Sequence, residues 1–267
     1  MSLAKPTRSN LPIPLTIAGS DPSGGAGVEA DLKVFLRHGL SGASVITALT
    51  WQGPGGVRDV TPVKIEAVRN HLQTLLDEMP IGAVKTGILS SPRMIAAVAR
   101  SLRERSLQVV VDPVIASTSG FIFLDGDGVR ALRHRLLPVA TIVAPNLDEA
   151  AYLSELDRAL VEKEPELAIQ KLHAMGPRWV LLKGGHASGP TATDYLSDGE
   201  TIHELRLPRL PVRAHGTGCA LTAAIVARLT LGDDMVAAAT AAKRYVHRAM
   251  RKSRVLSAGR AYLEFMA

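Results

Sequence analysis

Near the C-terminus, the sequence HGTGCALTAAI at residues 215–225 places a Gly-Thr-Gly segment directly before a cysteine. The apolar run at 220–231 predicts a helix that begins close to this segment. Four residues fall at its start: Gly216, Thr217, Gly218 and Cys219. The first N–H groups of a helix have no partner within it and lie at the positive end of the helix dipole. This arrangement suits an anion, in particular the charge on a phosphoryl group during transfer.

Cys219 is the only cysteine of the chain. A helix start lowers the pKa of a thiol from its ordinary value of about 8.5, so Cys219 could act as a base or orient a substrate hydroxyl. A lone cysteine is more often a small buried side chain that simply packs. The Gly-Thr-Gly context favours a functional cysteine.

Carboxylates follow two apolar segments, VVVDPVIASTSG at 109–120 and VAPNLDEA at 143–150. Asp112 and Glu149 are therefore candidate ligands of a hydrated Mg²⁺ held against phosphates. Capping is the alternative role: Asp112 can cap a turn, and Asn146 with Glu149 three residues later is close to a capping box. For Glu149 the two roles do not exclude each other.

Lys183 stands in LLKGGH at 181–186, at the end of an apolar run and before two glycines. Its ammonium suits a polyphosphate, with close backbone approach at the glycines, although an ordinary surface lysine is the alternative. The segment AGSDPSGGAGVEADLK at 18–33 is also glycine-rich, but it is neither a Walker A loop nor a GxGxxG motif. It suits close approach to a ligand; equally, it could be a plain connection in which Asp31 complements a helix dipole.

The elements that must position these residues alternate between short apolar runs and helical patterns. Strands are predicted at 14–18, 43–49, 83–86, 109–112, 141–144 and 180–183. Helices are predicted near 27–38, 64–78, 92–105, 127–137, 147–155 and 164–175. A hairpin follows at 193–207 with its turn at Asp198-Gly199, and helices at 217–231 and 233–252 end the domain.

This alternation predicts an α/β fold with a mostly parallel sheet covered on both faces. We expect residues 14–267 to form one domain and residues 1–13 to form a flexible arm. Nearly all the polar segments directly follow predicted strands, including Gln52 after the second. Because ligands of parallel sheets bind outside the carboxyl ends of the strands, we expect one shared cleft.

Composition narrows the class of protein further. The formal net charge is +6, but residues 1–14 carry +2 and residues 243–260 carry +7, so the remainder is mildly acidic. With four Phe, four Tyr and two Trp, few aromatic platforms are available for bases, which disfavours a nucleic-acid partner. No apolar run is long enough to span a membrane, no signal peptide is evident, and one cysteine allows no intrachain disulfide. We expect a cytoplasmic protein.

Taken in order, seven motifs resemble the hydroxymethylpyrimidine/phosphomethylpyrimidine kinases of thiamine biosynthesis, a branch of the ribokinase-like superfamily. They are AGSDPSGGAGVEADLK, VITALTxQ, KTGIL, DPVIASTSG, PNLDEA, KGGH and HGTGC, and the resemblance runs from about residue 14 to 250. It implies a three-layer αβα sandwich with a central, mostly parallel sheet and a small hairpin in the C-terminal half. It also implies ATP and Mg²⁺ as cofactors, with a monovalent cation as a further option, and a small pyrimidine substrate. The apolar closing helices allow a dimer, and we expect a homodimer.

The resemblance also implies roles for single residues. Cys219, with the backbone of Gly216, Thr217 and Gly218, matches the anion hole and the catalytic position, and Thr217 also matches a phosphate contact. Asp112, Asn146, Glu149 and Lys183 match the nucleotide and Mg²⁺ group, with Asp112 and Glu149 on the metal side. Six positions match the lining of the pyrimidine pocket: Gly19, Ala26, Asp31, Gln52, Ile88 and Val114.

The implied activity is phosphorylation of 4-amino-5-hydroxymethyl-2-methylpyrimidine and then of its monophosphate. Pyridoxal kinase activity, alone or in addition, is the nearest alternative, and a non-catalytic pyrimidine sensor is another. The sequence departs from the family in two places: Gly53-Pro54 replaces the usual Asn-Thr after Gln52, and the Gly-Pro-Val ending is absent. Either change bears on substrate preference.

Overall fold

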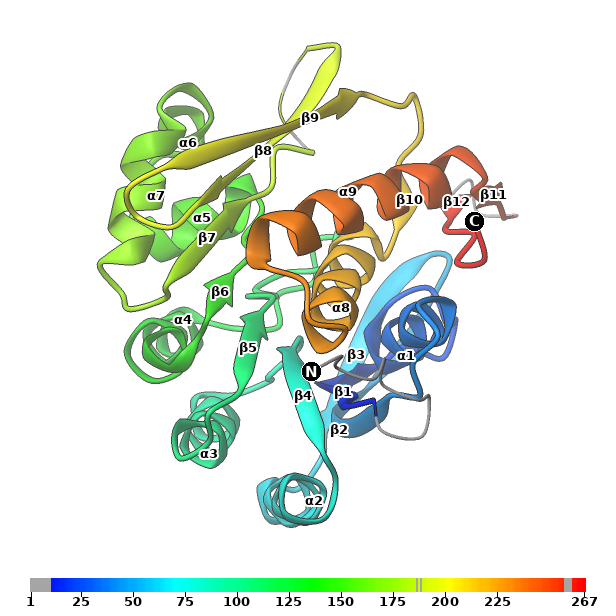
Figure 1. Cartoon of the computed structure of the whole chain (residues 1–267), viewed down its shortest axis with the longest axis vertical. Coiled ribbons are helices and arrows are strands. Elements are labelled where there is room, and N and C mark those ends of the chain that lie inside the picture. The colour runs from blue at the N-terminus through cyan, green and yellow to red at the C-terminus, as the bar shows by residue number, and fades with distance from the viewer. Residues whose placement is uncertain (1–10, 186, 188, 257–260) are drawn as a thin grey trace, which may run out of the picture.

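A large sheet organises the chain in this computed structural model, which describes residues 11–185, 187, 189–256 and 261–267 (Figure 1). Its strand order is β3-β2-β1-β4-β5-β6-β7-β8-β9. The strands are β1 (Ile13–Ser20), β2 (Ala43–Gly53), β3 (Gly56–Pro62), β4 (Ile81–Thr86), β5 (Gln108–Val111), β6 (Ile142–Val143), β7 (Trp179–Leu182), β8 (Thr191–Ser197) and β9 (Ile202–Pro208). The expected arm falls mostly on residues 1–10, which lie outside the described residues.

In this sheet, the neighbouring strands β2, β1, β4, β5, β6 and β7 pair in parallel. The edge strand β3 and the hairpin strands β8 and β9 pair with their neighbours in antiparallel fashion. Parallel neighbours need crossover connections, and helices supply them here. The mostly parallel sheet predicted from the alternating pattern is therefore confirmed, and the carboxyl ends of β1, β4, β5, β6 and β7 share one edge.

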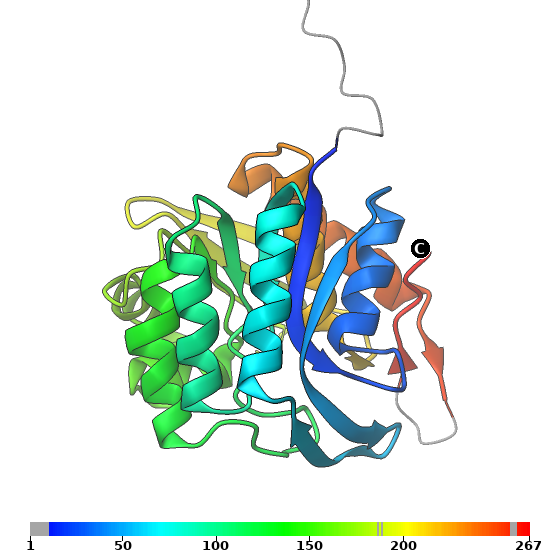
Figure 2. The same ribbon diagram turned by 90° about the horizontal axis from the view of Figure 1, so that it is seen from below.

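Helices cover both faces of the sheet, as Figure 2 shows from a second direction. One face carries α2 (Ile65–Glu78), α3 (Pro92–Arg103), α4 (Gly126–Ala131), α5 (Leu147–Ser154), α6 (Arg158–Lys163) and α7 (Pro165–His173). The other carries α1 (Gly27–Arg37), α8 (Thr217–Thr230) and α9 (Met235–Arg251). After α4 the chain continues through a π-helical turn, η2 (Leu132–Leu136), and a 3-10 turn, η3 (Leu137–Val139). The predicted three-layer αβα sandwich is confirmed.

The helix α8 is enclosed between the sheet, α1 and α9. Small side chains make this close approach possible, because Ala220, Ala223, Ala224 and Ala227 are all fully buried. The N-terminus of α8 is thereby fixed against the central strands. No helix in the described ranges is both long enough and apolar enough to cross a bilayer.

The predicted hairpin is confirmed as β8 and β9, with Gly199 in the turn at a φ of +99°. Three features were not predicted: β3, α6, and a small sheet of order β10-β12-β11, with β10 (Ala214–His215), β11 (Arg254–Val255) and β12 (Ala261–Tyr262). The expectation that the two closing helices end the domain is therefore wrong, since β11 and β12 follow α9.

The prediction that Gln52 follows the second strand is wrong. Gln52 lies within β2 and pairs with Val57 of β3. Pro54 and Gly55 form the two-residue connection between the paired Gly53 and Gly56. The departure from the family at Gly53-Pro54 thus lies at the tip of a β-hairpin. β2 pairs with β1 only as far as Leu49, so this hairpin extends past the carboxyl end of β1 (Figure 2).

Candidate functional site

The start of α8 depends on a glycine. Gly216 is the N-cap residue and has a φ of +80°, a conformation that favours glycine. A Cβ at this position would lie 1.8 Å from the carbonyl oxygen of Gly25, so no other residue fits without a backbone shift. Among the described residues, no side chain caps the helix, and its first turn holds no acidic residue. The first N–H groups of α8 therefore have no side-chain cap in the described structure, an arrangement that can receive an anion.

The two glycine-rich segments meet at this point. The carboxylate of Asp21 accepts hydrogen bonds from the backbone N–H groups of Ser23 and Ala26, each at 2.9 Å, and its Oδ2 lies 2.9 Å from Nε2 of His215. Burial by itself raises the pKa of Asp21, but the hydrogen bonds to His215 and Ser23 outweigh it and lower the pKa. Asp21 and His215 together fix the loop before α1 against the start of α8. Neither Asp21 nor His215 was assigned a role from the sequence. The one sequence feature that could have indicated a role for His215 is its position directly before Gly-Thr-Gly.

A lysine joins the two predicted metal ligands. The Nζ of Lys183, just after β7, lies 2.9 Å from Oδ1 of Asp112, just after β5, and 3.7 Å from Oε2 of Glu149. Both carboxylates are largely buried. Glu149 and Asn146 form the predicted capping box of α5, with hydrogen bonds of 2.7 and 2.9 Å. His186 of the same motif lies outside the described residues.

Burial raises the pKa of Glu149 to about 7; Lys183 opposes this shift and the neighbouring Asp112 adds to it. For Lys183, burial lowers the pKa, but Asp112 and Glu149 outweigh it and the net shift is upward. One ammonium thus balances two enclosed carboxylates. Their oxygens are the donors that Mg²⁺ prefers, and Mg²⁺ commonly uses one or two carboxylates together with substrate phosphates. Asp112 and Glu149 fit such an ion, and no cluster of three His, Cys, Asp or Glu side chains offers another site in the described ranges.

The start of α8 and the lysine group belong to one site. A Cβ on Gly218 would lie 3.4 Å from Nζ of Lys183 and 3.8 Å from Oδ2 of Asp112. The same carboxylate oxygen lies 3.3 Å from Oγ1 of Thr222, one turn into α8. Free helix N–H groups, an ammonium and two carboxylates therefore adjoin one another at the carboxyl edge of the sheet.

Cys219 lies in this group and is partly exposed. Burial raises the pKa of its thiol to about 11; the charge of Lys85 and the backbone N–H of Gly27 oppose the shift without cancelling it. The prediction that the helix start lowers this pKa is therefore wrong, because loss of solvation outweighs the favourable charges. At neutral pH the thiol is protonated, which favours the orienting role over that of a ready base.

Asp31 forms a buried ion pair that the sequence did not indicate. Its Oδ2 lies 2.8 Å from Nζ of Lys85 and 2.6 Å from Oγ1 of Thr16, and neither member of the ion pair is exposed. Burial raises the pKa of Asp31, and Lys85 opposes this. Oδ1 of Asp31 is buried with no hydrogen-bond partner in the described part of the chain. Lys85 received no role from the sequence. The signal that could have found it is the position of a lysine within the apolar strand that contains the KTGIL motif.

The other predicted pocket residues lie around the ends of β1, β2, β4 and β5. Ile88 contacts Gly19, where a Cβ would lie 3.3 Å from the Ile88 Cδ1 atom. Ala26 is the N-cap of α1 and is partly exposed. Gln52 and Val114 are partly exposed as well, but among the described residues no hydrogen bond joins the Gln52 amide to the rest of the set.

A three-layer α/β fold with an anion hole beside a lysine and two carboxylates defines a phosphoryl-transferring enzyme of the ribokinase-like class. Solved structures agree. A Bacillus subtilis pyridoxal kinase in an ADP complex is 33% identical with a TM-score of 0.89, and the match covers 97% of this chain and 98% of that one. A phosphomethylpyrimidine kinase from Clostridium difficile is 34% identical with a TM-score of 0.76, covering 89% and 99%.

The sequence model of the phosphomethylpyrimidine kinase family matches residues 21–264. A hydroxymethylpyrimidine/phosphomethylpyrimidine kinase of Streptomyces coelicolor is 45% identical over 236 residues, which is 88% of this chain and 87% of that protein. One of Rhizobium meliloti is 45% identical over 250 residues, 92% and 93% of the two chains. The chain belongs to the phosphomethylpyrimidine kinase family, and the resemblance noted in the sequence is confirmed.

Proposed function

We propose that this kinase transfers a phosphoryl group from ATP to the hydroxymethyl group of 4-amino-5-hydroxymethyl-2-methylpyrimidine, and then a second one to the resulting monophosphate, in thiamine biosynthesis. The observation that carries this proposal is the contact between the start of α8 and the Lys183–Asp112 pair. Phosphoryl transfer needs chiefly positioning and charge stabilisation, and these groups supply both.

Each charged group then has a task during transfer. The backbone N–H groups of Gly216 to Cys219, with the hydroxyl of Thr217, receive the phosphoryl oxygens, and Lys183 places a positive charge against the nucleotide phosphates. Asp112 and Glu149 would hold Mg²⁺, which offsets phosphate charge when bound. Asn146 keeps Glu149 in place through the capping box. A requirement for a monovalent cation is also part of the proposal and is tested by exchanging K⁺ for Na⁺ in the assay.

The acceptor differs between the two steps. In the first step it is an alcohol, which must be oriented and whose proton can pass to the transferred phosphoryl group as the new P–O bond forms and the bond to ADP breaks. We propose that the Cys219 thiol makes the orienting contact. In the second step it is a phosphate, which is already an anion and has no need of this contact. We therefore assign Cys219 mainly to the first step.

The pyrimidine is proposed to lie against Gly19, Ala26, Ile88 and Val114, with Gln52 and Asp31 facing its polar edge. Oδ1 of Asp31 supports this role, because it is the one oxygen of that carboxylate without a partner in the described structure. The neighbouring Lys85 opposes the rise in the pKa of Asp31 that burial causes, and it holds Oδ2 in an ion pair of 2.8 Å.

Pyridoxal phosphorylation is the second candidate activity, alone or in addition. It is favoured by the higher TM-score and fuller coverage of the Bacillus subtilis pyridoxal kinase compared with the Clostridium difficile phosphomethylpyrimidine kinase. The curated relatives favour the pyrimidine, because those at 45% identity are named for it.

A homodimer is also proposed, but not through the closing helices, whose apolar side chains are buried within the same chain. A better surface is the outer face of β2, where Ile46, Leu49 and Trp51 are exposed. A one-residue register shift beside Thr47 brings these three side chains to the same face. Trp51→Glu is expected to shift the mass measured by light scattering from dimer to monomer.

Because the reaction consumes ATP, we propose that the enzyme works in the cytoplasm.

The activity is tested by mass spectrometry of the products formed with ATP and Mg²⁺. The hydroxymethylpyrimidine, its monophosphate and pyridoxal are offered in separate reactions. Products from both pyrimidines support the proposal, and the pyridoxal reaction shows whether the second activity is present. Product from pyridoxal alone would overturn the pocket assignment at Gln52 and its hairpin. No product in any reaction would support the pyrimidine-sensor alternative.

A further inference from the structure

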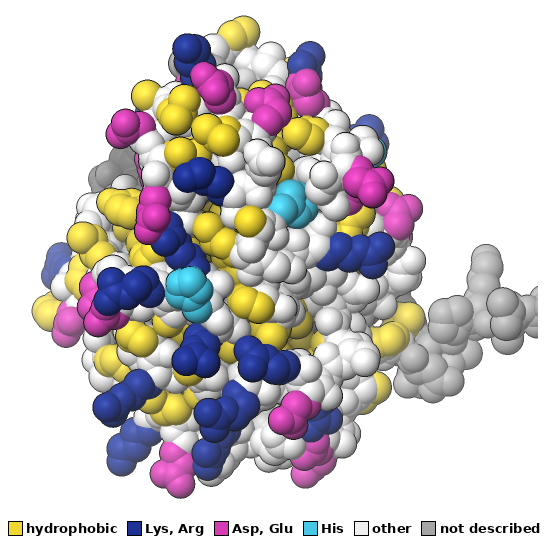
Figure 3. All heavy atoms as spheres, turned by 90° about the vertical axis from the view of Figure 1, so that its left-hand side faces the viewer, with side chains coloured by type: hydrophobic (Ala, Val, Ile, Leu, Met, Phe, Trp, Pro, Cys, Tyr) yellow, Lys and Arg dark blue, Asp and Glu magenta, His cyan; other side chains and the backbone are white. Residues whose placement is uncertain are grey.

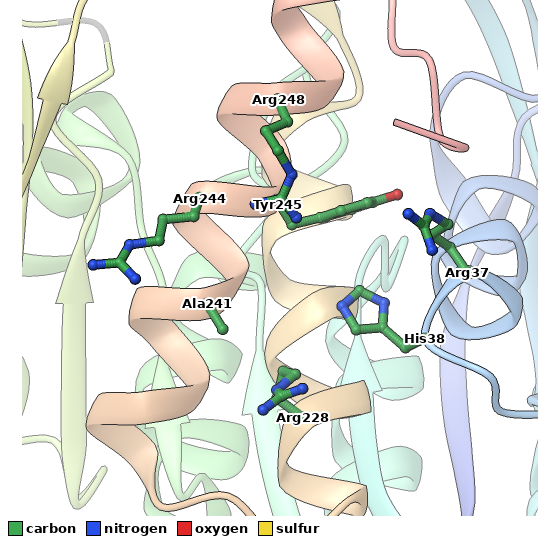
Figure 4. Close-up of a pocket in the computed structure, with 7 residues that line it drawn as sticks. All are labelled: Arg37, His38, Arg228, Ala241, Arg244, Tyr245 and Arg248. Atoms are coloured by element: carbon green, nitrogen blue, oxygen red, sulfur yellow. The ribbon is translucent and has the colours of Figure 1, made fainter.

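A pocket away from the candidate site lies at the C-terminal ends of α1 and α8, against one side of α9 (Figure 4). Its volume is about 350 Å³, and its lining consists of Arg37, His38, Arg228, Ala241, Arg244, Tyr245 and Arg248. Arg228 stands eleven residues after Thr217 along α8, which at 1.5 Å per residue places it about 17 Å from the anion hole.

Four arginines from three helices meet at this pocket. Arg228 is balanced by Asp233, with 2.6 Å between Nε and Oδ2, while Arg37 donates to a backbone oxygen of Ala267 at 3.3 Å. Arg244 and Arg248 have no acidic partner in the described part of the chain. Figure 4 shows Arg37, His38 and Arg248 gathered around Tyr245, with Arg244 directed outward from the rim.

The positive charges of the pocket affect the pKa of His38. Burial lowers the pKa of His38, and the charges of Arg228, Arg37 and Arg248 lower it further. Its Nδ1 is 2.8 Å from the carbonyl oxygen of Val34, and its ring packs edge-on against Tyr245. Asp233 balances Arg228, but no acidic side chain in the described structure balances Arg244 or Arg248, so the guanidinium groups that line this hollow repel one another unless an anion binds between them.

Helix dipoles explain part of this cluster but not all of it. Arg37 and Arg228 stand in the last turns of α1 and α8, where a cation is favourable, and Arg248 stands in the last turn of α9. Arg244 has no such role. A dipole also gives no reason for side chains of three helices to line one pocket.

We propose that this pocket binds a small anion with one or two phosphate groups. A phosphate group carries a charge of about −1.5 to −2 at neutral pH and accepts paired N–H donors, which matches guanidinium groups in charge and in shape. The volume is near the lower end of the range for small-molecule sites, so a short inorganic polyphosphate or a compact phosphate ester fits, and a long chain does not.

The test uses His38 as a local reporter, because a phosphate compound also meets the anion hole of the candidate site. The imidazole resonance is assigned by its loss in His38→Gln, and its pKa is followed by NMR with inorganic pyrophosphate or phenyl phosphate. Bound anion offsets the arginine charges, so the pKa of His38 is expected to rise and to saturate. Tighter binding of pyrophosphate supports an inorganic ligand, and tighter binding of phenyl phosphate supports an ester.

The matched variants are Arg244→Gln with Arg248→Gln, and as a control Arg100→Gln with Arg103→Gln. The control arginines are exposed on α3, on the other side of the sheet, and Figure 3 shows basic side chains among acidic ones on a face away from the pocket. The pocket variant is expected to weaken binding by about tenfold or more, and the control by less than about twofold. Equal losses in both variants, or no saturating shift of His38 in the unmodified protein, would overturn the proposal. The second outcome needs no variant and no kinase activity, so it is independent of the proposed function.

Discussion

Replacing Lys85 with methionine is expected to lower the free energy of unfolding by about 3–5 kcal/mol, the range for breaking a buried ion pair. Nζ of Lys85 lies 2.8 Å from Oδ2 of Asp31, and neither side chain is exposed. Methionine retains most of the side-chain volume, so the main change is the loss of charge. Asp31 is then a buried carboxylate whose one remaining partner among the described residues is Thr16. In a chain of 267 residues this corresponds to a fall in Tm of about 6–20 °C.

The sign of the pH dependence follows from the same contact. Burial already raises the pKa of Asp31, and loss of Lys85 removes the charge that opposes this shift. A carboxyl whose folded pKa is raised contributes most stability below its unfolded pKa of about 3.9 and loses it as the pH rises. The deficit of Lys85→Met is therefore expected to be larger at pH 8 than at pH 5.

Urea unfolding of Lys85→Met, Asp31→Asn and the double variant forms the assay. The double variant removes both charges and is expected to be more stable than the sum of the two single losses implies, because each single change leaves one unpaired charge. A loss below about 1 kcal/mol in Lys85→Met, or purely additive effects, would show that the pair does not carry this stability.

Three further outcomes are expected. Cys219→Ala reduces product formation from the alcohol far more than from the monophosphate, as measured by initial rates with each acceptor; equal losses would reject the division of roles. At pH 8, iodoacetamide modifies Cys219 at least about tenfold more slowly than free cysteine, and the rate still rises toward pH 10, because burial raises the thiol pKa to about 11; a plateau below pH 8 would contradict this. Gly216→Ala abolishes activity, because a Cβ there would lie 1.8 Å from the oxygen of Gly25, whereas Gly126→Ala, whose Cβ would lie 4.0 Å from the nearest atom, a side-chain nitrogen of Arg130, leaves activity unchanged; equal activities of the two variants would refute the steric reason.

Most of the elements could be predicted because their apolar residues repeat with the period of a strand or a helix. The predicted helices near 27–38 and 64–78 correspond to α1 and α2 within a residue or so. The strand β3 was missed because its sequence, GVRDVTP, has little apolar alternation, and most of its residues are at least partly exposed. The small sheet was missed for a related reason: β10, β11 and β12 have two residues each, too few for any period.

Part of the candidate site could also be predicted from the sequence, and part could not. Segments that follow predicted strands, such as those of Asp112 and Lys183, could be grouped from the sequence alone, because parallel strands bring their carboxyl ends to one edge. The ion pair of Asp31 with Lys85 and the contact of Asp21 with His215 could not, since each joins residues far apart in the chain.

The parallel strands, most of the helices, the glycine-rich helix starts and the family could be read from the sequence, because these depend on local patterns and on motifs in a fixed order. Which charges are enclosed together emerged only from the three-dimensional structure. Burial reversed the expected shift of the Cys219 pKa, gave Lys85 a carboxylate partner, and brought arginines of α1, α8 and α9 to one pocket. Solvation and Coulomb energies depend on distances and exposure in three dimensions, and a linear pattern does not contain them.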